Sequence, residues 1–285
     1  MQSKSYFQKV LVAVDGSETS LHAEELSVKL AREFGSKVTA VHVIPEQILD
    51  LSVKTPRDIP KSALGEISEW FIKKGEEILK NVEAVFEEEG IKVETKSEHG
   101  DPAEYVITLA ARDEFDLVVI GNRGETEAEL YSLGSTAEKI SRHAECPVLI
   151  VKEKSSISKI LVGSDGSEKA KKSLEYAVQL AQKLNAEITV VNVQERGLFG
   201  PKPEVAQKVG NHTLSQIIDG LKGVRATQKL EYGNPAERII ELASEENHDL
   251  IVVGSRGLSR TKRFFLGSVS DDIAHHSRCS VLIVR

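Results

Sequence analysis

The chain has 285 residues, 40% hydrophobic and 28% charged, which is the composition of a globular protein rather than a disordered or fibrous one. Its formal net charge of −7 argues against a general nucleic-acid-binding or anionic membrane surface. Two cysteines are too few for a disulfide framework, and no apolar run approaches the roughly 20 residues that span a bilayer, so we expect a soluble, cytoplasmic protein.

Short apolar runs alternate with stretches of helical spacing along the chain. In the first half the predicted strands are Val10–Val14, Val38–Ile44, Ile91–Thr95, Leu117–Ile120 and Val148–Val151. In the second half they are Ile160–Gly163, Ile188–Val193, Ala226–Leu230, Leu250–Val253 and Val281–Val284. Their Val and Ile content is typical of parallel strands that are buried on both faces.

Helical stretches lie between these strands, such as Ser17–Phe34 and its counterpart Ser167–Leu184. Asp101 and Asn234 are each followed by Pro-Ala-Glu, the pattern of an N-cap with proline at the first helical position. Five strands alternating with four helices predict a doubly wound, Rossmann-like α/β fold with a five-stranded parallel sheet in each half. Such sheets bind ligands at the carboxyl ends of their strands.

The two halves are copies of one unit. Gly121–Lys152 and Gly254–Arg285 align without a gap and share 13 of 32 residues, where chance gives about two. The offset falls from 150 at Asp15 and Asp165 to 133 at these segments, mainly through Pro45–Trp70, which is longer in the first copy. We predict domains at residues 1–152 and 160–285, joined by a linker at 153–159.

The first candidate site residue is the aspartate that ends the first strand, Asp15 or Asp165. Each is followed by Gly-Ser, so a turn with Ser17 or Ser167 as helix cap is the structural alternative. A residue that ends a central strand also faces the binding crevice of such a sheet.

A glycine array, G-x2-G-x9-G-S, follows the fourth strand of each copy. It comprises Gly121, Gly124, Gly134 and Ser135 in the first copy and Gly254, Gly257, Gly267 and Ser268 in the second. Glycines let a backbone approach a ligand, and a helix that starts after the array favours an anion. A single G-x-x-G would mark only turns, but two full matches at corresponding positions predict a phosphate cradle.

These motifs, with the terminal C-x-V-L-I-V, resemble the universal stress proteins, in the branch that binds ATP, over nearly the whole chain and twice. The resemblance implies adenine near the end of strand two, at Val43 and Val193, where ordinary core packing is the alternative. It implies ribose and phosphates on the glycine loop and its serine, with the strand-one aspartate nearby. It also implies pairing of the two domains through their last strands.

The nine residues between the second and third glycines differ in charge. The first copy has Glu125, Glu127 and Glu129, and the second has Arg260, Lys262 and Arg263, while an arginine, Arg123 or Arg256, precedes both loops. If these loops lie over phosphates, domain 2 is the stronger ATP site. Domain 1 would bind AMP, bind through a divalent cation such as Mg²⁺, or stay empty. If the side chains point to solvent, screening shrinks the difference.

The sequence thus predicts a nucleotide-binding regulatory protein rather than an enzyme, with an adenine nucleotide and an unidentified protein as partners. It has no P-loop, no G-x-G-x-x-G and no zinc-ligand spacing. A slow ATPase or nucleotide-dependent enzyme on the same fold is the alternative, and a structural adaptor is a third reading. A homodimer built on the intrachain pair stays open.

Overall fold

The computed structural model describes residues 6–45, 61–124, 133–153, 156–195, 203–217, 221–257 and 266–285. Over these residues each half has five strands and four helices, as predicted. The first half contains β1 (Lys9–Ala13), α1 (Glu18–Phe34), β2 (Lys37–Pro45), α3 (Lys61–Glu88), β3 (Val93–Gly100), α4 (Pro102–Arg112), β4 (Leu117–Gly121), α5 (Ser135–His143) and β5 (Val148–Val151). The second contains β6 (Lys159–Gly163), α6 (Glu168–Leu184), β7 (Glu187–Gln194), α7 (Pro203–Ser215), β8 (Ala226–Tyr232), α8 (Pro235–Glu245), β9 (Leu250–Gly254), α9 (Ser268–His276) and β10 (Ser280–Val284).

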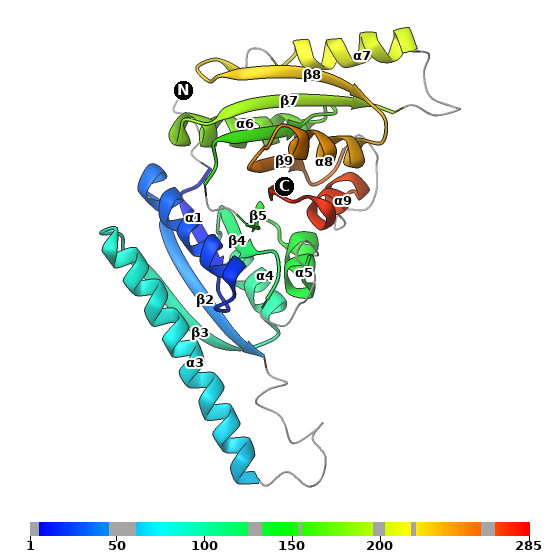
Figure 1. Ribbon diagram of the computed structural model, residues 1–285. Coiled ribbons are helices and arrows are strands. Elements are labelled where there is room, and N and C mark those ends of the chain that lie inside the picture. The colour runs from blue at the N-terminus through cyan, green and yellow to red at the C-terminus, as the bar shows by residue number, and fades with distance from the viewer. Residues whose placement is uncertain are drawn as a thin grey trace.

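All ten strands form one sheet, in the order β3-β2-β1-β4-β5-β10-β9-β6-β7-β8. Figure 1 shows β2, β3 and α3 at one end of the molecule and β7, β8 and α7 at the other. Neighbouring strands are parallel within each half, whereas β5 and β10 pair antiparallel, with Leu149 opposite Leu282. The last strands of the two halves therefore pair as predicted, across a pseudo-two-fold axis. In each half the chain first adds strands on one side of its first strand, β1 or β6, and then crosses to the other side. Doubly wound sheets bind ligands beside the strand where this crossing occurs.

The apolar core lies on both faces of the sheet. Val10 and Val12 of β1 pack with α1 and α3 on one face, while Leu11 packs with α4 and α5 on the other. Each central strand is covered on both sides, so its residues are apolar without alternation. This is why the apolar runs located the central strands so well.

The predicted helix caps are present in both copies. Ser17 and Ser167 each accept a backbone N–H of the first turn through Oγ, at 3.3 and 3.2 Å. Asp101 and Asn234 each accept two such N–H groups through Oδ1. These side chains bond N–H groups that have no partner within the helix, and so fix where each helix begins.

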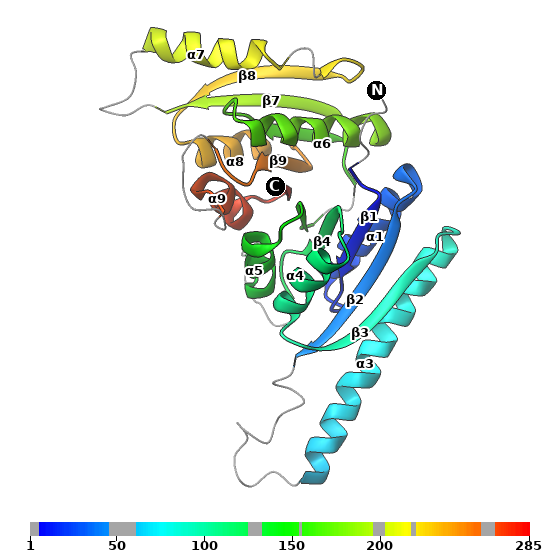
Figure 2. The ribbon, with the colours of Figure 1, turned by 180° about the vertical axis from the view of Figure 1, so that it is seen from behind.

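Two elements of the first half differ from the prediction. The third strand lies at Val93–Gly100 rather than at the predicted Ile91–Thr95. β3 is at the edge of the sheet and is polar, so no apolar run marks where it begins and ends. The longer segment Pro45–Trp70 ends inside α3, a helix of 28 residues. From both sides of the molecule, α3 runs past the ends of β2 and β3 (Figure 1, Figure 2).

Part of the segment predicted as a linker, 153–159, packs into the second half. Ile157 is 8% exposed, and Ser158 Oγ donates to Asp249 Oδ2 at 2.6 Å. β6 then begins at Lys159. The packed part of the second half therefore starts a few residues before residue 160.

Candidate functional site

The aspartate after the first strand is held by its own turn. Asp15 Oδ1 accepts the N–H of Ser17 at 3.0 Å, and Asp165 Oδ1 accepts the N–H of Ser167 at 2.9 Å. The glycine between them has φ of 81° in both copies, a left-handed conformation that favours glycine. The turn therefore fixes the orientation of each aspartate side chain at the edge of the sheet where the parallel strands end.

The second glycine of the array lies against this aspartate. A Cβ on Gly124 would stand 2.8 Å from Asp15 Oδ2, and a Cβ on Gly257 would stand 2.4 Å from Asp165 Oδ2. Both distances are well inside the roughly 3.5 Å at which non-bonded heavy atoms pack. Two motifs that lie far apart in the sequence thus meet in both copies, and any larger residue at the glycine would displace the aspartate carboxylate.

The other two glycines shape the loop. A Cβ on Gly121 would stand 2.9 Å from the backbone carbon of Thr19, so glycine is needed where β4 packs on α1. The N–H of Gly134 donates to Asn122 O at 2.7 Å, and the corresponding bond in the second copy is 2.8 Å. This N–H group closes the loop and is not available to a phosphate.

The helix that follows the array offers the available donors. Gly134 is the N-cap of α5 and Gly267 is the N-cap of α9, so neither helix has a capping side chain. The N–H groups of a first turn have no intrahelical partner and carry the positive end of the helix dipole. The starts of α5 and α9 therefore offer donors to an anion that the N–H groups of Gly134 and Gly267 do not.

A polar side chain on the second strand, half-buried in the first copy and buried in the second, was missed by sequence reasoning and bonds to the end of the first strand. His42 Nδ1 donates to Val14 O at 2.8 Å, and Asn192 Nδ2 donates to Ser164 O at 2.7 Å. These bonds tie β2 to the end of β1 and β7 to the end of β6. A polar residue recurring inside an apolar strand of both copies was the available signal.

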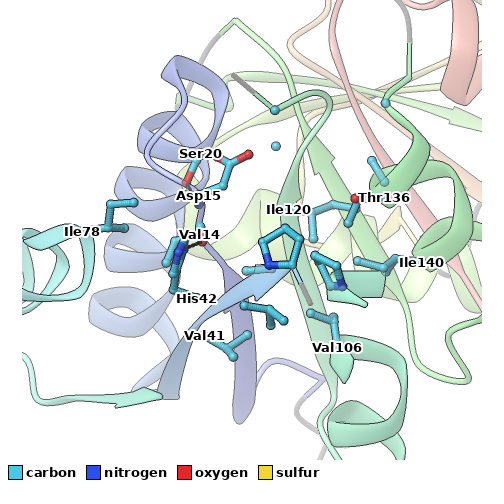
Figure 3. A pocket seen from close by; sticks show the side chains of 18 of the residues that line it. Val14, Asp15, Ser20, Val41, His42, Ile78, Val106, Ile120, Thr136 and Ile140 are labelled. Carbon is cyan, nitrogen blue, oxygen red and sulfur yellow. Dashed lines mark hydrogen bonds between the residues drawn. The ribbon is translucent and has the colours of Figure 1, made fainter. Parts of the chain in front are cut away.

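A cavity of about 330 Å³ opens at the carboxyl edge of the first half. All six residues predicted for the first site line it: Asp15, Val43, Gly121, Gly124, Gly134 and Ser135. In Figure 3, Ile78 of α3 stands on one side and Thr136 of α5 on the other, with Asp15 between them. The lining residues that sequence reasoning did not mark include Ser20, Phe71, Lys74 and Val106.

In the second half the predicted residues gather at the corresponding edge. Asp165 and Gly257 meet as described, a Cβ on Gly267 would stand 3.4 Å from Arg256 Cα, and Gly254 packs on Lys169. Val193, half-buried, lies near the end of β7, and Ser268 is the first residue of α9.

Positive charge is concentrated at this second edge. Burial, followed by the neighbouring cations Arg256 and Arg285, lowers the pKa of the Lys169 amine. The first half has Thr19 at the position of Lys169, and there Thr19 Oγ1 donates to Arg123 O at 2.8 Å. The two sites therefore differ in charge among the described residues as well as in loop sequence.

The loop residues on which the predicted asymmetry rests lie outside the described residues. They are Glu125, Glu127, Glu129, Arg260, Lys262 and Arg263. Among the residues that are described, no group of three or more His, Cys, Asp or Glu could hold a metal ion. None of the described helices is long and apolar enough to cross a membrane.

The family model of the universal stress protein family matches residues 6–152 and again residues 156–285. The chain belongs to the universal stress protein family. The motif resemblance of both halves is thereby confirmed.

Two curated universal stress proteins each match about half of this chain. One from Methanocaldococcus jannaschii is 34% identical over 151 residues, 53% of this chain and 85% of that protein. YxiE of Bacillus subtilis is 35% identical over 147 residues, 51% of this chain and 99% of that protein. The crystal structure of a universal stress protein from Archaeoglobus fulgidus matches both halves, with a TM-score of 0.73, 25% identity and coverage of 97% of this chain and 98% of that one.

Proposed function

We propose that this universal stress protein is a nucleotide-binding regulatory protein of the stress response, with an adenine nucleotide, ATP or AMP, as its ligand. The cavity of the first half carries the proposal, because Asp15, Gly124 and the first turn of α5 meet there from three separate segments. An apolar wall beside an uncapped helix start suits a base at one end and phosphate at the other.

We assign the base to the β2 end of the cavity and the phosphates to the β4 end. Val41 and Val43 of β2 give an apolar wall, while Ser135 and Arg123 lie where α5 begins and β4 has ended. Asp15 stands between, where its carboxylate can accept from ribose hydroxyls. Mg²⁺ is proposed only as a companion of the phosphates, because the described residues provide no metal-binding cluster of their own.

In the second half the same placement puts Val193 beside the base and Asp165 beside the ribose. The phosphates would lie among Gly254, Arg256, Gly257, Gly267 and Ser268. We propose this as the stronger ATP site, because Lys169, Arg256 and Arg285 repel one another there and an anion would relieve the repulsion. The basic loop sequence supports the same order of affinity.

Binding, rather than turnover, is the proposed activity. Occupancy of the sites would change which protein partner the molecule binds, in the cytoplasm and as this tandem pair or as a homodimer of it. A slow ATPase is the alternative, and release of phosphate from Mg-ATP by the purified chain, abolished in the Gly257→Val variant, would establish it instead.

The direct test is to identify by mass the nucleotide that co-purifies with the full-length chain, and to titrate ATP into it by calorimetry. The proposal expects an adenine nucleotide and saturable binding. A chain that purifies without nucleotide and shows no binding of ATP or AMP would overturn it.

A further inference from the structure

Glu24 is a buried carboxylate that connects to the cavity of the first half. It lies on α1 and is 2% exposed. Ser20 Oγ donates to Glu24 Oε1 at 3.1 Å and accepts the N–H of Asp15 at 3.2 Å. Ser20 and Asp15 both line the cavity, and they lie together in Figure 3. A short chain of hydrogen bonds therefore joins the buried carboxylate to the candidate ligand site.

The second copy shows that the fold does not require this carboxylate. At an offset of 150 residues, Ala170 stands where the first copy has Ser20, and Leu174 stands where it has Glu24. Both α1 and α6 have 17 residues and a serine N-cap, and Leu174 is as buried as a core residue should be, 7% exposed. A polar group that the same helix replaces with leucine elsewhere in the chain serves something other than packing.

The surroundings of Glu24 favour its protonated form. Burial raises the pKa of this carboxyl to about 7, the Ser20 hydrogen bond lowers it in part, and the Asp15 and Glu25 carboxylates raise it further. The core residues of β1, β4 and α3 on this face of the sheet are apolar. Lys152, the cation that follows β5, donates through Nζ to carbonyls at the end of α9.

We propose that Glu24 is a positioning residue of the domain 1 site, acting through Ser20 and Asp15, and that the site binds its anionic nucleotide together with a proton on Glu24. This proposal rests on the proposed function. When Glu24 is ionised, a second negative charge stands one hydroxyl away from Asp15 and opposes the phosphates. When it is protonated, that charge is absent. Domain 2 has no such group, so its affinity lacks this dependence on pH.

The test uses the full-length chain with the second site blocked by Gly257→Val, titrated with ATP at pH 6 and pH 8. We expect ATP to bind roughly fivefold more weakly at pH 8 than at pH 6, beyond any change that ATP itself causes. Glu24→Gln, which keeps the shape and removes the charge, should abolish that extra change. Glu25→Gln alters the exposed neighbour on the same helix and should retain it.

The outcomes separate the two proposals. If Glu24→Gln changes the affinity by the same factor at both pH values, Glu24 has only a structural role and the inference falls, while nucleotide binding stands. Equal pH profiles for the parent and Glu24→Gln have the same consequence. A parent that binds no ATP at either pH overturns the function proposed for this site and the inference with it.

Discussion

At the scale of single residues, Gly257 lies directly against the carboxylate of Asp165 in the second site. A valine there would place its Cβ 2.4 Å from Asp165 Oδ2. Gly257 is exposed, so the substitution disturbs the site rather than the core. We expect Gly257→Val to lower ATP affinity at this site by more than tenfold with little change in melting temperature, measured by calorimetry in a chain whose first site carries Gly124→Val. Gly65→Val, on the exposed part of α3 where a Cβ would meet no atom within 4 Å, is the control. An unchanged affinity of Gly257→Val for ATP would place the ligand elsewhere.

The sequence located this residue but not the cause of its importance. The spacing of the array predicted that Gly257 would face a ligand. The structure shows that Gly257 also lies against the side chain of Asp165, 92 residues earlier in the sequence. Glu24 was not distinguished at all, because it stands next to Glu25 in a run that reads as a solvated helix face. Only comparison with Leu174 at the same position of the second copy reveals it.

Glu24 also predicts how stability varies with pH. Its pKa is about 7 in the folded chain against the usual 4.5, so the folded state binds more protons between these values and its stability falls as pH rises through this window. The free energy of unfolding should therefore fall by about 2 kcal/mol more in the parent than in Glu24→Gln between pH 5 and pH 8. Urea unfolding at the two pH values measures this, and parallel curves for parent and variant would show that Glu24 is not held protonated.

At the scale of elements, the helix after the second strand distinguishes the two sites. Gly75 of α3 packs on His42 and Gly210 of α7 packs on Asn192, which fixes the register of the two helices at an offset of 135. Lys74, which lines the first cavity, therefore corresponds to Val209, which is 49% exposed. The two sites therefore share the glycine array but differ in the helix, α3 or α7, that lies beside it.

This register predicts the effect of exchanging the residue. In the full-length chain with the second site blocked by Gly257→Val, Lys74→Val should weaken ATP binding roughly two- to fivefold, since it removes a partly exposed cation from the cavity. Lys73→Val makes the same change on the exposed face of α3 and should leave ATP affinity unchanged. Calorimetry measures the ATP affinity of both variants. Equal losses of affinity would mean that the total charge of α3 matters and the position of Lys74 in the cavity does not.

Helices and strands were predictable wherever burial in the core requires a regular pattern of apolar residues. Central strands are covered on both faces, so their apolar runs marked them within one or two residues, and capping residues marked where α1 and α4 begin. β3 was misplaced because its residues face solvent at the sheet edge. The amino-terminal part of α3 was missed because it extends past the sheet, where Trp70 is 56% exposed and no core imposes a helical period.

At the scale of the whole molecule, the two sites are linked through the seam between the halves. Arg142 of α5 makes two hydrogen bonds with Asp271 of α9, at 3.1 and 2.9 Å. Lys152 donates to carbonyls at the end of α9, and Arg285 donates to Ser141 O in α5. Both α5 and α9, the helices that follow the glycine arrays, are therefore bonded to the opposite half.

The inequality of the two sites gives the last prediction: domain 2 binds ATP more tightly than domain 1. Three basic loop residues in domain 2 stand against three acidic ones in domain 1. Lys169 replaces Thr19, and Lys74 of the first cavity, which has Val209 as its counterpart, offsets that one charge. At about 0.2–1 kcal/mol for each of the six loop charges, the sum is about 1–6 kcal/mol, which is at least about fivefold in affinity. The full-length Gly124→Val and Gly257→Val chains isolate the two sites for calorimetry. High salt should narrow the difference, because it screens exposed charges, and low salt should widen it.

Replacing the acidic residues of the first loop tests the cause of the difference. Glu125, Glu127 and Glu129 changed together to Gln should strengthen ATP binding to domain 1, and most strongly at low salt. The same triple change at Glu87, Glu88 and Glu89, at the exposed end of α3, removes the same total charge at a distance and should have little effect. Equal affinities of the two sites, or equal effects of the two triple variants, would show that the first loop does not lie over the phosphates. If the two sites still differ while the two triple variants have equal effects, the difference comes from residues outside the first loop. Lys169, which the salt series tests, and Glu24, which the pH series tests, are two such residues.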